Sequence, residues 1–186
     1  SSRVRAAALL LLFAGALLRI AGLFHPPPLD IDEARYLVTA HHVATGTGYS
    51  DWRGPETHIH PAHPLLTAAL AGKRIDALET SGRIATCFGA ILCLIPLALL
   101  ACRLDGEVTA LLALVFLALH PLLARNASAI APEGVYVLFA SLGLVTLLPA
   151  EGTLPRPRRW MLAGFLFGAA YLARPEGLLV GLLSGS

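Results

Sequence analysis

Long apolar runs alternate with short polar segments along this chain, and the pattern predicts helices that cross a membrane. A helix needs about 20 apolar residues to cross about 30 Å of hydrocarbon. Five stretches reach or approach that length, each bounded by charged residues, proline or glycine. The predicted spans are residues 6–24, 82–102, 108–124, 130–149 and 160–183.

Interruptions in the first, second and last of these runs affect the helices that we expect. Arg19 lies inside the first run, and Pro96 is expected to kink the second because a proline removes one helical hydrogen bond. In the last run the apolar pattern stops after Ala173, meets Arg174 and Pro175, and then resumes. A break in the last helix is therefore expected at this point.

The long segment 25–80 is polar but patterned. Three consecutive prolines, 26–28, predict an extended exit from the first span. Apolar residues then recur at helical spacing from Glu33 to Ala44, which predicts an amphipathic helix at the membrane interface. A second short helix is expected from Pro64 to about Leu78. The fold class is thus all-α: one polytopic membrane domain over residues 1–186, with interfacial helices in its first outer loop.

Composition supports a membrane protein. Hydrophobic residues make up 56% of the chain and charged residues 14%, whereas soluble domains have about a quarter of their residues charged. The formal charge of +2, without a basic face, argues against a nucleic-acid partner. The three cysteines all lie in one apolar region, at spacings that suit neither a zinc site nor a disulfide framework.

The distribution of arginine predicts an orientation. Arginines precede the first span, lie between the second and third, and lie between the fourth and fifth, where short cytoplasmic loops carry positive charge. An alternating path places all three groups on one side. The N-terminus is therefore expected in the cytoplasm, and segment 25–80, the turn near Arg125 and the break at Arg174 on the extracytoplasmic side.

Three carboxylates cluster just after the first span, at Asp30, Asp32 and Glu33. Asp30 and Glu33 match a capping box, in which each side chain binds a backbone N–H at the start of a helix. That role does not require Asp32. A positioned carboxylate at a membrane surface can serve as a general base toward a hydroxyl, and Asp32 is the candidate.

Histidines suggest either a metal site or a polar lining. His58, His60 and His63 lie within six positions, and three imidazoles can hold zinc with an open coordination position. Their spacing is not a recognised ligand pattern, and the prolines among them indicate a rigid turn. A divalent cation is the only cofactor that the sequence suggests.

Outward-facing cations offer sites for an anion. Arginine near a membrane needs an acidic partner or an anionic ligand. Arg83 either extends to lipid head groups or binds phosphate, and Arg174 either pairs with Glu176 or binds phosphate. Arg35, on the helix of Asp32, can orient that acid or contribute to the same phosphate site.

Glu133 follows Pro132 near the outer end of the fourth span. A carboxylate suits the positive end of a helix. It can also approach the first outer loop and complete a polar site there. Both roles stay open.

In their order, these motifs resemble the GT-C membrane glycosyltransferases, especially the protein O-mannosyltransferase and aminoarabinose transferase group. The resemblance rests on an acidic pair after the first span, a His-Pro turn, an arginine heading the next span, an acid opening a later helix, and a Leu-x-Arg-Pro-Glu-Gly segment. In this chain these are Asp32-Glu33, residues 60–65, Arg83, Glu133 and residues 172–177.

The resemblance implies an inverting transfer of a sugar from a polyprenyl-phosphate donor to a hydroxyl of a protein, lipid or glycan acceptor, on the extracytoplasmic face. It implies that Asp32 is the catalytic base, with Glu33 beside it in the acidic pair. Arg83 and Arg174 would neutralise the lipid phosphate, and Glu133 would shape the acceptor side. His60 and His63 would line the site.

Two features depart from the family pattern. The turn reads His-Pro-Ala-His-Pro rather than an uninterrupted Pro-Pro, and family members are several times longer. We therefore expect this chain to be the N-terminal part of a longer protein. The rival hypothesis is a non-catalytic membrane protein, such as a transporter fragment or a lipid-binding assembly subunit.

Overall fold

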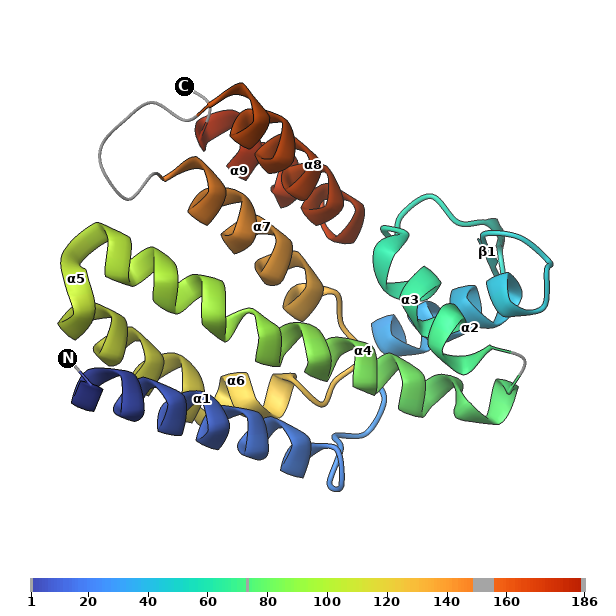
Figure 1. Ribbon diagram of the computed structural model, residues 1–186. Helices are drawn as coiled ribbons and strands as arrows, with labels where there is room; N and C mark the ends of the chain where they lie inside the picture. The colour runs from blue at the N-terminus through green and yellow to red at the C-terminus, as the bar shows by residue number, and fades with distance from the viewer. Residues whose placement is uncertain (1, 73, 149–155, 185–186) are drawn as a thin grey trace.

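The computed structural model describes residues 2–72, 74–148 and 156–184, and it is built almost entirely of helices (Figure 1). The prediction of an all-α protein is confirmed. The described elements are α1 (Ser2–Gly22), α2 (Ile31–Ala44), β1 (Ser50–Asp51), β2 (Gly54–Pro55), α3 (Ala62–Ala71), the 3-10 turn η1 (Ile75–Ala77), α4 (Leu78–Leu92), α5 (Leu94–Leu119), α6 (Pro121–Asn126), α7 (Glu133–Leu147), α8 (Pro157–Ala173) and α9 (Glu176–Ser184).

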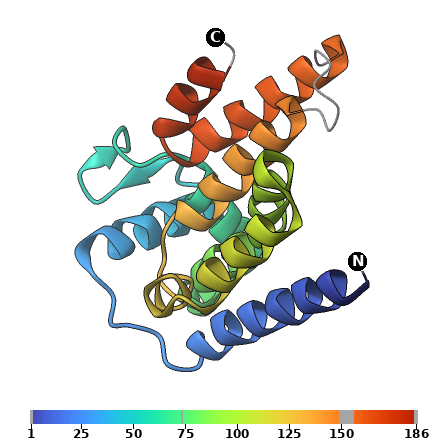
Figure 2. The ribbon, with the colours of Figure 1, turned by 90° about the vertical axis from the view of Figure 1, so that its left-hand side faces the viewer.

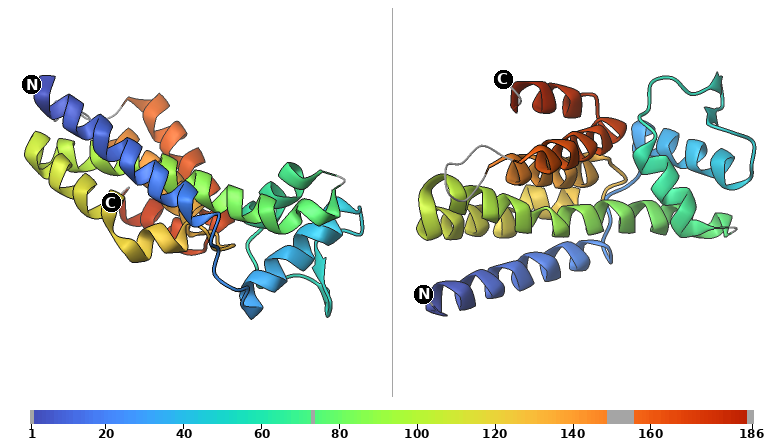
Figure 3. Two further views of the ribbon diagram at one scale, coloured as in Figure 1. Left: turned by 90° about the horizontal axis from the view of Figure 1, so that it is seen from below. Right: turned by 45° about the horizontal axis from the view of Figure 1, so that its top comes forward.

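The long helices lie in successive layers. Helix α1 packs on α5, α5 on α7, α7 on α8, and α8 on α9, as Figures 1 and 2 show from two sides. Figure 3 shows α2, α3 and the small antiparallel hairpin of β1 and β2 gathered at one end of these layers. The start of α1 and the turn within α5 lie at the other end (Figure 1).

Helix α5 reverses direction at Asp105 and Gly106. Asp105 has φ −151° and ψ 23°, and Gly106 has φ 85°, which glycine adopts without steric cost. The turn separates a first arm (residues 94–104) from a second arm (residues 107–119). The sequence prediction of two spans, 82–102 and 108–124, therefore has its turn in the right place, although the second arm ends at Leu119.

Arg19 connects α1 to the end of the second arm. Pro121 has no N–H, so the carbonyl of Leu117 lacks its usual helical partner. Arg19 supplies one: its Nη2 donates to the Leu117 carbonyl at 2.7 Å, and its Nη1 donates to the Ala118 carbonyl at 3.2 Å. A Cβ on Gly15 would lie 2.9 Å from the Ala118 Cβ, so the two helices also approach closely here. The buried arginine thus satisfies two carbonyls at the end of the helix, one of which loses its helical partner to the proline.

Two glycines bring the backbones of α4 and α7 into contact. A Cβ on Gly89 would lie 2.7 Å from the Gly134 carbonyl carbon, and one on Gly134 would lie 2.6 Å from the Thr86 carbonyl oxygen. Small residues permit this kind of close packing between membrane helices. Because Gly134 directly follows Glu133, the contact also fixes where Glu133 lies.

The predicted span 160–183 is two helices that pack against each other. Arg174 is extended, with φ −152° and ψ 144°, because Pro175 disfavours a helical conformation in the residue before it. Helix α9 then returns along α8, and Gly177 packs directly against the backbone of Ala170 and Tyr171. The break was predicted from the sequence; the hairpin that it creates was not.

Two further boundaries differ from the prediction. Helix α3 ends at Ala71 rather than near Leu78, because Gly72 has φ 58°. Helix α4 begins at Leu78, inside the predicted outer loop 25–80. The fourth span, predicted over 130–149, corresponds to α7, and residue 149 lies outside the described residues.

Among the described residues, two stretches are long and apolar enough to cross a membrane: Ser2–Gly22 and Ile75–Leu119, the second of which contains the reversal in α5. Together with the composition, they support a helical membrane protein. The number of crossings and the side on which each end lies stay predictions.

Candidate functional site

The first turn of α2 positions the acidic cluster. Asp30 is the N-cap, and its Oδ1 accepts a hydrogen bond from the Glu33 N–H at 2.8 Å, as the predicted capping box requires. The prediction that the Glu33 side chain binds the backbone N–H of Asp30 is wrong. Glu33 does not return to Asp30, because its Oε1 accepts instead from the Ile130 N–H at 3.0 Å.

Glu33 is buried, with 7% of its surface exposed, and links α2 to the loop that precedes α7. Its second carboxylate oxygen has no hydrogen-bond partner among the described residues. This location suits a structural acid rather than a group that exchanges protons with a substrate. The resemblance had placed Glu33 beside Asp32 in the catalytic pair, and the two side chains differ sharply in surroundings.

Asp32 is exposed at the start of the same helix. No described residue donates a hydrogen bond to its carboxylate or forms an ion pair with it. One helical turn further, Tyr36 lies on the same face of α2. Asp32 is therefore the acid of this cluster that remains available to a ligand.

Tyr36 is the point at which several charged groups meet. Burial, followed by the nearby Glu133 carboxylate, raises the pKa of Tyr36 to about 12, and the Asp32 carboxylate adds to this effect. The Arg174 guanidinium acts in the opposite direction. The phenol therefore lies within electrostatic reach of α2, α7 and the junction between α8 and α9. Sequence reasoning missed Tyr36, although its position four residues after Asp32 was a usable signal.

Arg174 joins α7 to the α8–α9 junction. Its Nη1 donates to Glu133 Oε1, and its Nε and Nη2 donate to the carboxylate of Glu176 at 3.3 Å each. The three side chains are 35%, 55% and 46% exposed, in the order Arg174, Glu133 and Glu176. The predicted pairing with Glu176 is confirmed, and Glu133 is a second partner that the sequence did not indicate.

The three histidines do not converge. His63 is fully buried, its Nε2 lies 2.9 Å from Thr86 Oγ1, and burial lowers its pKa to about 4. Its ring meets Tyr36 edge-on, with centroids 5.4 Å apart. His60 instead contacts Tyr171 of α8, again edge-on at 5.4 Å. His63 thus packs against the Tyr36 ring, while His60 attaches the loop between β2 and α3 to α8.

A metal site finds no support. His58 is exposed, and its backbone N–H donates to Glu56 Oε1 at 2.6 Å. Within residues 2–72, 74–148 and 156–184, no group of three or more histidine, cysteine, aspartate or glutamate side chains is arranged to hold a metal ion. The divalent cation suggested by the histidine spacing therefore has no described site.

Two of the predicted phosphate-binding arginines are engaged elsewhere. Arg35 pairs with Glu56 at 3.0 Å and Asp51 at 3.4 Å, and both acids are buried. The pair attaches the hairpin to α2. Because Arg35 already has two acidic partners, the structure supports neither of its predicted roles, which were to orient Asp32 and to bind phosphate.

Arg83 is 5% exposed and binds three separate elements. It donates to Glu79 on its own helix, to the Ser128 carbonyl at 2.6 Å and to the Pro27 carbonyl at 3.1 Å. A phosphate would have to replace these bonds in a buried position. Arg83 therefore holds the fold together, in contrast to Asp32, Glu133 and Arg174 around Tyr36.

The chemistry available at this surface is that of an exposed carboxylate and an ion-paired guanidinium around one phenol. Asp32 comes from α2, Glu133 from α7, and Arg174 and Glu176 from the α8–α9 junction, while His60 and Tyr171 lie beside them. A hydroxyl could lose a proton to Asp32, and Arg174 could meet an anion.

Comparison with known proteins identifies the family. Residues 60–183 match the family model described as dolichyl-phosphate-mannose-protein mannosyltransferase. The match contains Glu133, Arg174 and Glu176, and it begins after Asp32 and Tyr36. Searches of the curated proteins and of the solved structures found no match. Since the matched region covers most of the chain and includes three of the charged groups at this surface, the chain belongs to the dolichyl-phosphate-mannose-protein mannosyltransferase family.

Proposed function

We propose that this protein is an inverting glycosyltransferase that moves a sugar from a polyprenyl-phosphate donor to an acceptor hydroxyl on the extracytoplasmic face of a membrane. Family membership indicates a glycosyltransferase of the mannosyltransferase type. The donor class, the side of the membrane and the residue roles are our proposal. The observation that carries it is the exposed Asp32 carboxylate, whose charge acts on the same Tyr36 phenol as the charges of Glu133 and Arg174.

Asp32 acts as the general base. Its carboxylate accepts the proton of the acceptor hydroxyl while the hydroxyl oxygen forms a bond to the anomeric carbon of the sugar. The bond between that carbon and the phosphate oxygen breaks, and the lipid phosphate leaves from the opposite face of the sugar ring. The anomeric configuration is therefore inverted. A base must be within hydrogen-bond reach of the proton that it accepts, and an exposed side chain without a described partner can meet that condition.

Arg174 stabilises the phosphate that leaves. Negative charge builds up on the phosphate oxygens as the bond to the sugar breaks, and a positioned cation lowers the energy of that state. Ion pairs between exposed groups are weak, so a phosphate can compete with the Glu133 and Glu176 carboxylates for this guanidinium. Arg83 was the other candidate, but its bonds are buried and already made.

Glu133 pairs with Arg174, and the Tyr36 phenol is influenced by the charges of both Asp32 and Arg174. When a phosphate takes Arg174, the Glu133 carboxylate loses its partner and becomes available to hydrogen-bond an acceptor. The Tyr36 hydroxyl is protonated at neutral pH, as any phenol is, and burial raises its pKa further, to about 12, so it can donate to a sugar or acceptor oxygen. His60 and Tyr171 border the same surface. These residues are proposed to bind and orient the two substrates.

The direct test is Asp32→Asn in the natural protein reconstituted in liposomes with a radiolabelled polyprenyl-phosphate mannose donor. Loss of a general base should lower the transfer rate by about 100-fold or more. Asp76→Asn, which removes another exposed carboxylate from the outer segment, is the matched control and should leave transfer unchanged. Undiminished turnover by Asp32→Asn would remove Asp32 as the base. If the unmodified protein binds the donor without turnover, the rival lipid-binding role holds.

A further inference from the structure

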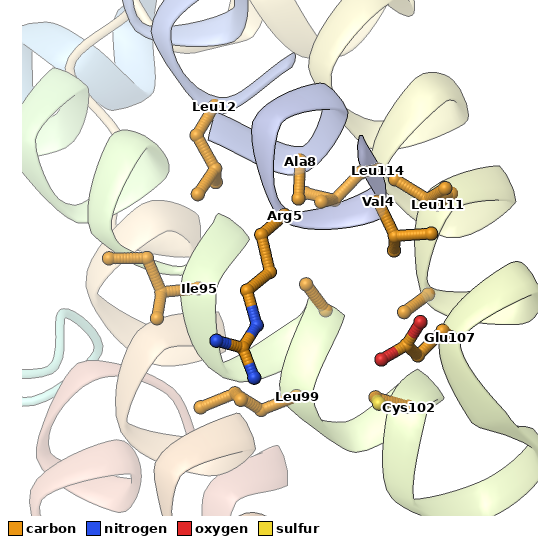
Figure 4. A pocket seen from close by; sticks show the side chains of 12 residues that line it. Val4, Arg5, Ala8, Leu12, Ile95, Leu99, Cys102, Glu107, Leu111 and Leu114 are labelled. Atoms are coloured by element: carbon orange, nitrogen blue, oxygen red, sulfur yellow. The ribbon is translucent and has the colours of Figure 1, made fainter. Parts of the chain in front are cut away.

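A pocket lies at the opposite end of α1 from the site around Tyr36. Its volume is about 340 Å³, and it lies between α1 and the two arms of α5 (Figure 4). Apolar side chains form most of its lining, among them Ala8, Leu12, Ile95, Leu99, Leu111 and Leu114. Arg5 and Glu107 are the charged residues of this lining.

The pocket follows from how α1 is held. Near its C-terminal end, Arg19 and Gly15 bring α1 tightly against the second arm of α5. Toward the N-terminus the residues that face α5 include Ala8, and the facing arms contribute Ala98 and Ala110. These methyl side chains leave space between the helices. Because the lining of this space is mostly apolar, hydrocarbon suits it better than water does.

Arg5 provides a cation at the edge of the pocket. No residue in the described ranges accepts a hydrogen bond from its guanidinium or forms an ion pair with it. Figure 4 shows the guanidinium beside Ile95 and Leu99, directed away from Glu107. A guanidinium forms paired hydrogen bonds with phosphate oxygens. An apolar pocket with such a group at its edge matches a molecule that has a hydrocarbon chain and a phosphate.

We propose that this pocket binds one anionic phospholipid, with an acyl chain between α1 and α5 and its phosphate on Arg5. A free phosphate would use Arg5 but none of the apolar lining. A neutral lipid would use the lining but gain less from the guanidinium. The bound lipid would complete the packing of the N-terminal half of α1. This inference concerns a surface remote from Asp32 and does not depend on sugar transfer.

Native mass spectrometry of the detergent-purified protein tests the head group. Phosphatidylglycerol and phosphatidylcholine with identical chains are titrated separately, and retained lipids are counted. One phosphatidylglycerol should be retained, about fivefold more tightly than phosphatidylcholine. Arg5→Gln should remove this preference. The matched control Arg3→Gln, which removes an exposed charge two residues away that does not line the pocket, should keep it.

A second pair of variants tests the acyl chain. Ala8→Leu fills part of the pocket and should release both lipids, whereas Ala6→Leu places the same side chain at an exposed position and should release neither. Circular dichroism checks that each variant keeps its helices, and if Ala8→Leu does not fold, the arginine pair decides.

Three results would overturn the proposal. The first is equal retention of the two lipids. The second is an equal loss in Arg3→Gln and Arg5→Gln, which would mean general attraction to a charged helix end. The third is displacement of the lipid by inorganic phosphate at equal concentration, which would assign the pocket to free phosphate.

Discussion

Two groups of charged residues in this molecule differ in how far their side chains are available to a ligand. In the buried group, Arg83 and Glu33 bind backbone atoms of the loops beside them. In the exposed group, the Arg174 guanidinium pairs with the carboxylates of Glu133 and Glu176, which are about half exposed, and Asp32 has no hydrogen-bond or ion-pair partner among the described residues. The same residue types thus hold loops together in one place and stay accessible to a ligand in the other.

The difference follows from what each side chain must satisfy. A buried backbone carbonyl or N–H without a partner costs free energy, so Arg83 and Glu33 are committed to the fold. Exposed pairs exchange readily with water and other ions. A substitution in the buried group should therefore act mainly on stability, and one in the exposed group mainly on sugar transfer.

The largest stability effect is expected for Arg83→Ala. The substitution removes the partners of the Ser128 and Pro27 carbonyls and leaves the connecting loops unattached. Each carbonyl left without a partner should cost about 1–3 kcal/mol, so the free energy of unfolding should fall by about 2–6 kcal/mol. Denaturant titration in mild detergent measures it. Arg74→Ala, at an exposed position, is the control and should stay within about 0.5 kcal/mol.

Gly134→Ala comes next. Its Cβ would lie 2.6 Å from the Thr86 carbonyl oxygen, so α4 and α7 must separate. Overpacking of this kind should cost about 1–3 kcal/mol of stability. Transfer should fall as well, because Glu133 is the preceding residue. Gly164→Ala, whose Cβ would meet no described atom within 4 Å, should change neither stability nor transfer. If Gly134→Ala and Gly164→Ala lower stability equally, the contact between α4 and α7 is not the cause.

Acid should weaken the fold through His63. Its pKa is lowered from 6.5 to about 4 by burial, so the unfolded chain binds a proton at a higher pH than the folded protein does. The contribution of His63 to the free energy of unfolding is therefore fully present above pH 6.5. It falls by about 1.4 kcal/mol for each pH unit between 6.5 and about 4. Unfolding titrations at pH 7 and pH 5 test this. In His63→Gln the difference between the two pH values should shrink, and an unchanged difference would assign the effect to other groups.

The smallest stability effect is expected for Arg174→Gln. Its partners are exposed, so loss of the ion pairs should change the free energy of unfolding by less than about 1 kcal/mol. Transfer should nevertheless fall, because the leaving phosphate loses its cation. Arg174→Lys should recover part of the activity. A large loss of stability would place Arg174 in the buried group instead, and a normal rate of sugar transfer would remove its proposed role at the leaving phosphate.

Sequence pattern predicted the helices well and the fate of individual charges less well. The spacing of apolar residues and the length of the apolar runs located α1, α2 and both arms of α5. Glycine and proline near the ends of these helices marked the boundaries. The return of α9 along α8 depends on how Gly177 packs against Ala170, which is a tertiary contact and leaves no local signal beyond the Arg-Pro break.

The same limit applies to the candidate site. The sequence grouped Asp32, Glu133 and Arg174 by predicted sidedness, and the structure brings them near one phenol. Whether an arginine is exposed or buried depends on loops distant in sequence, such as the one that holds Ser128 beside Arg83. The sequence could therefore name the charged residues but not separate those that hold the fold from those open to a substrate.

The central claim is that Asp32, and not its neighbour Glu33, performs proton transfer. The most direct measurement compares the sugar-transfer rates of Asp32→Asn and Glu33→Gln in the same liposomes. Asp32→Asn should lose about 100-fold or more, while Glu33→Gln, whose amide oxygen can still accept from the Ile130 N–H, should keep most of its activity. The reverse order, or full activity in Asp32→Asn, would contradict the account.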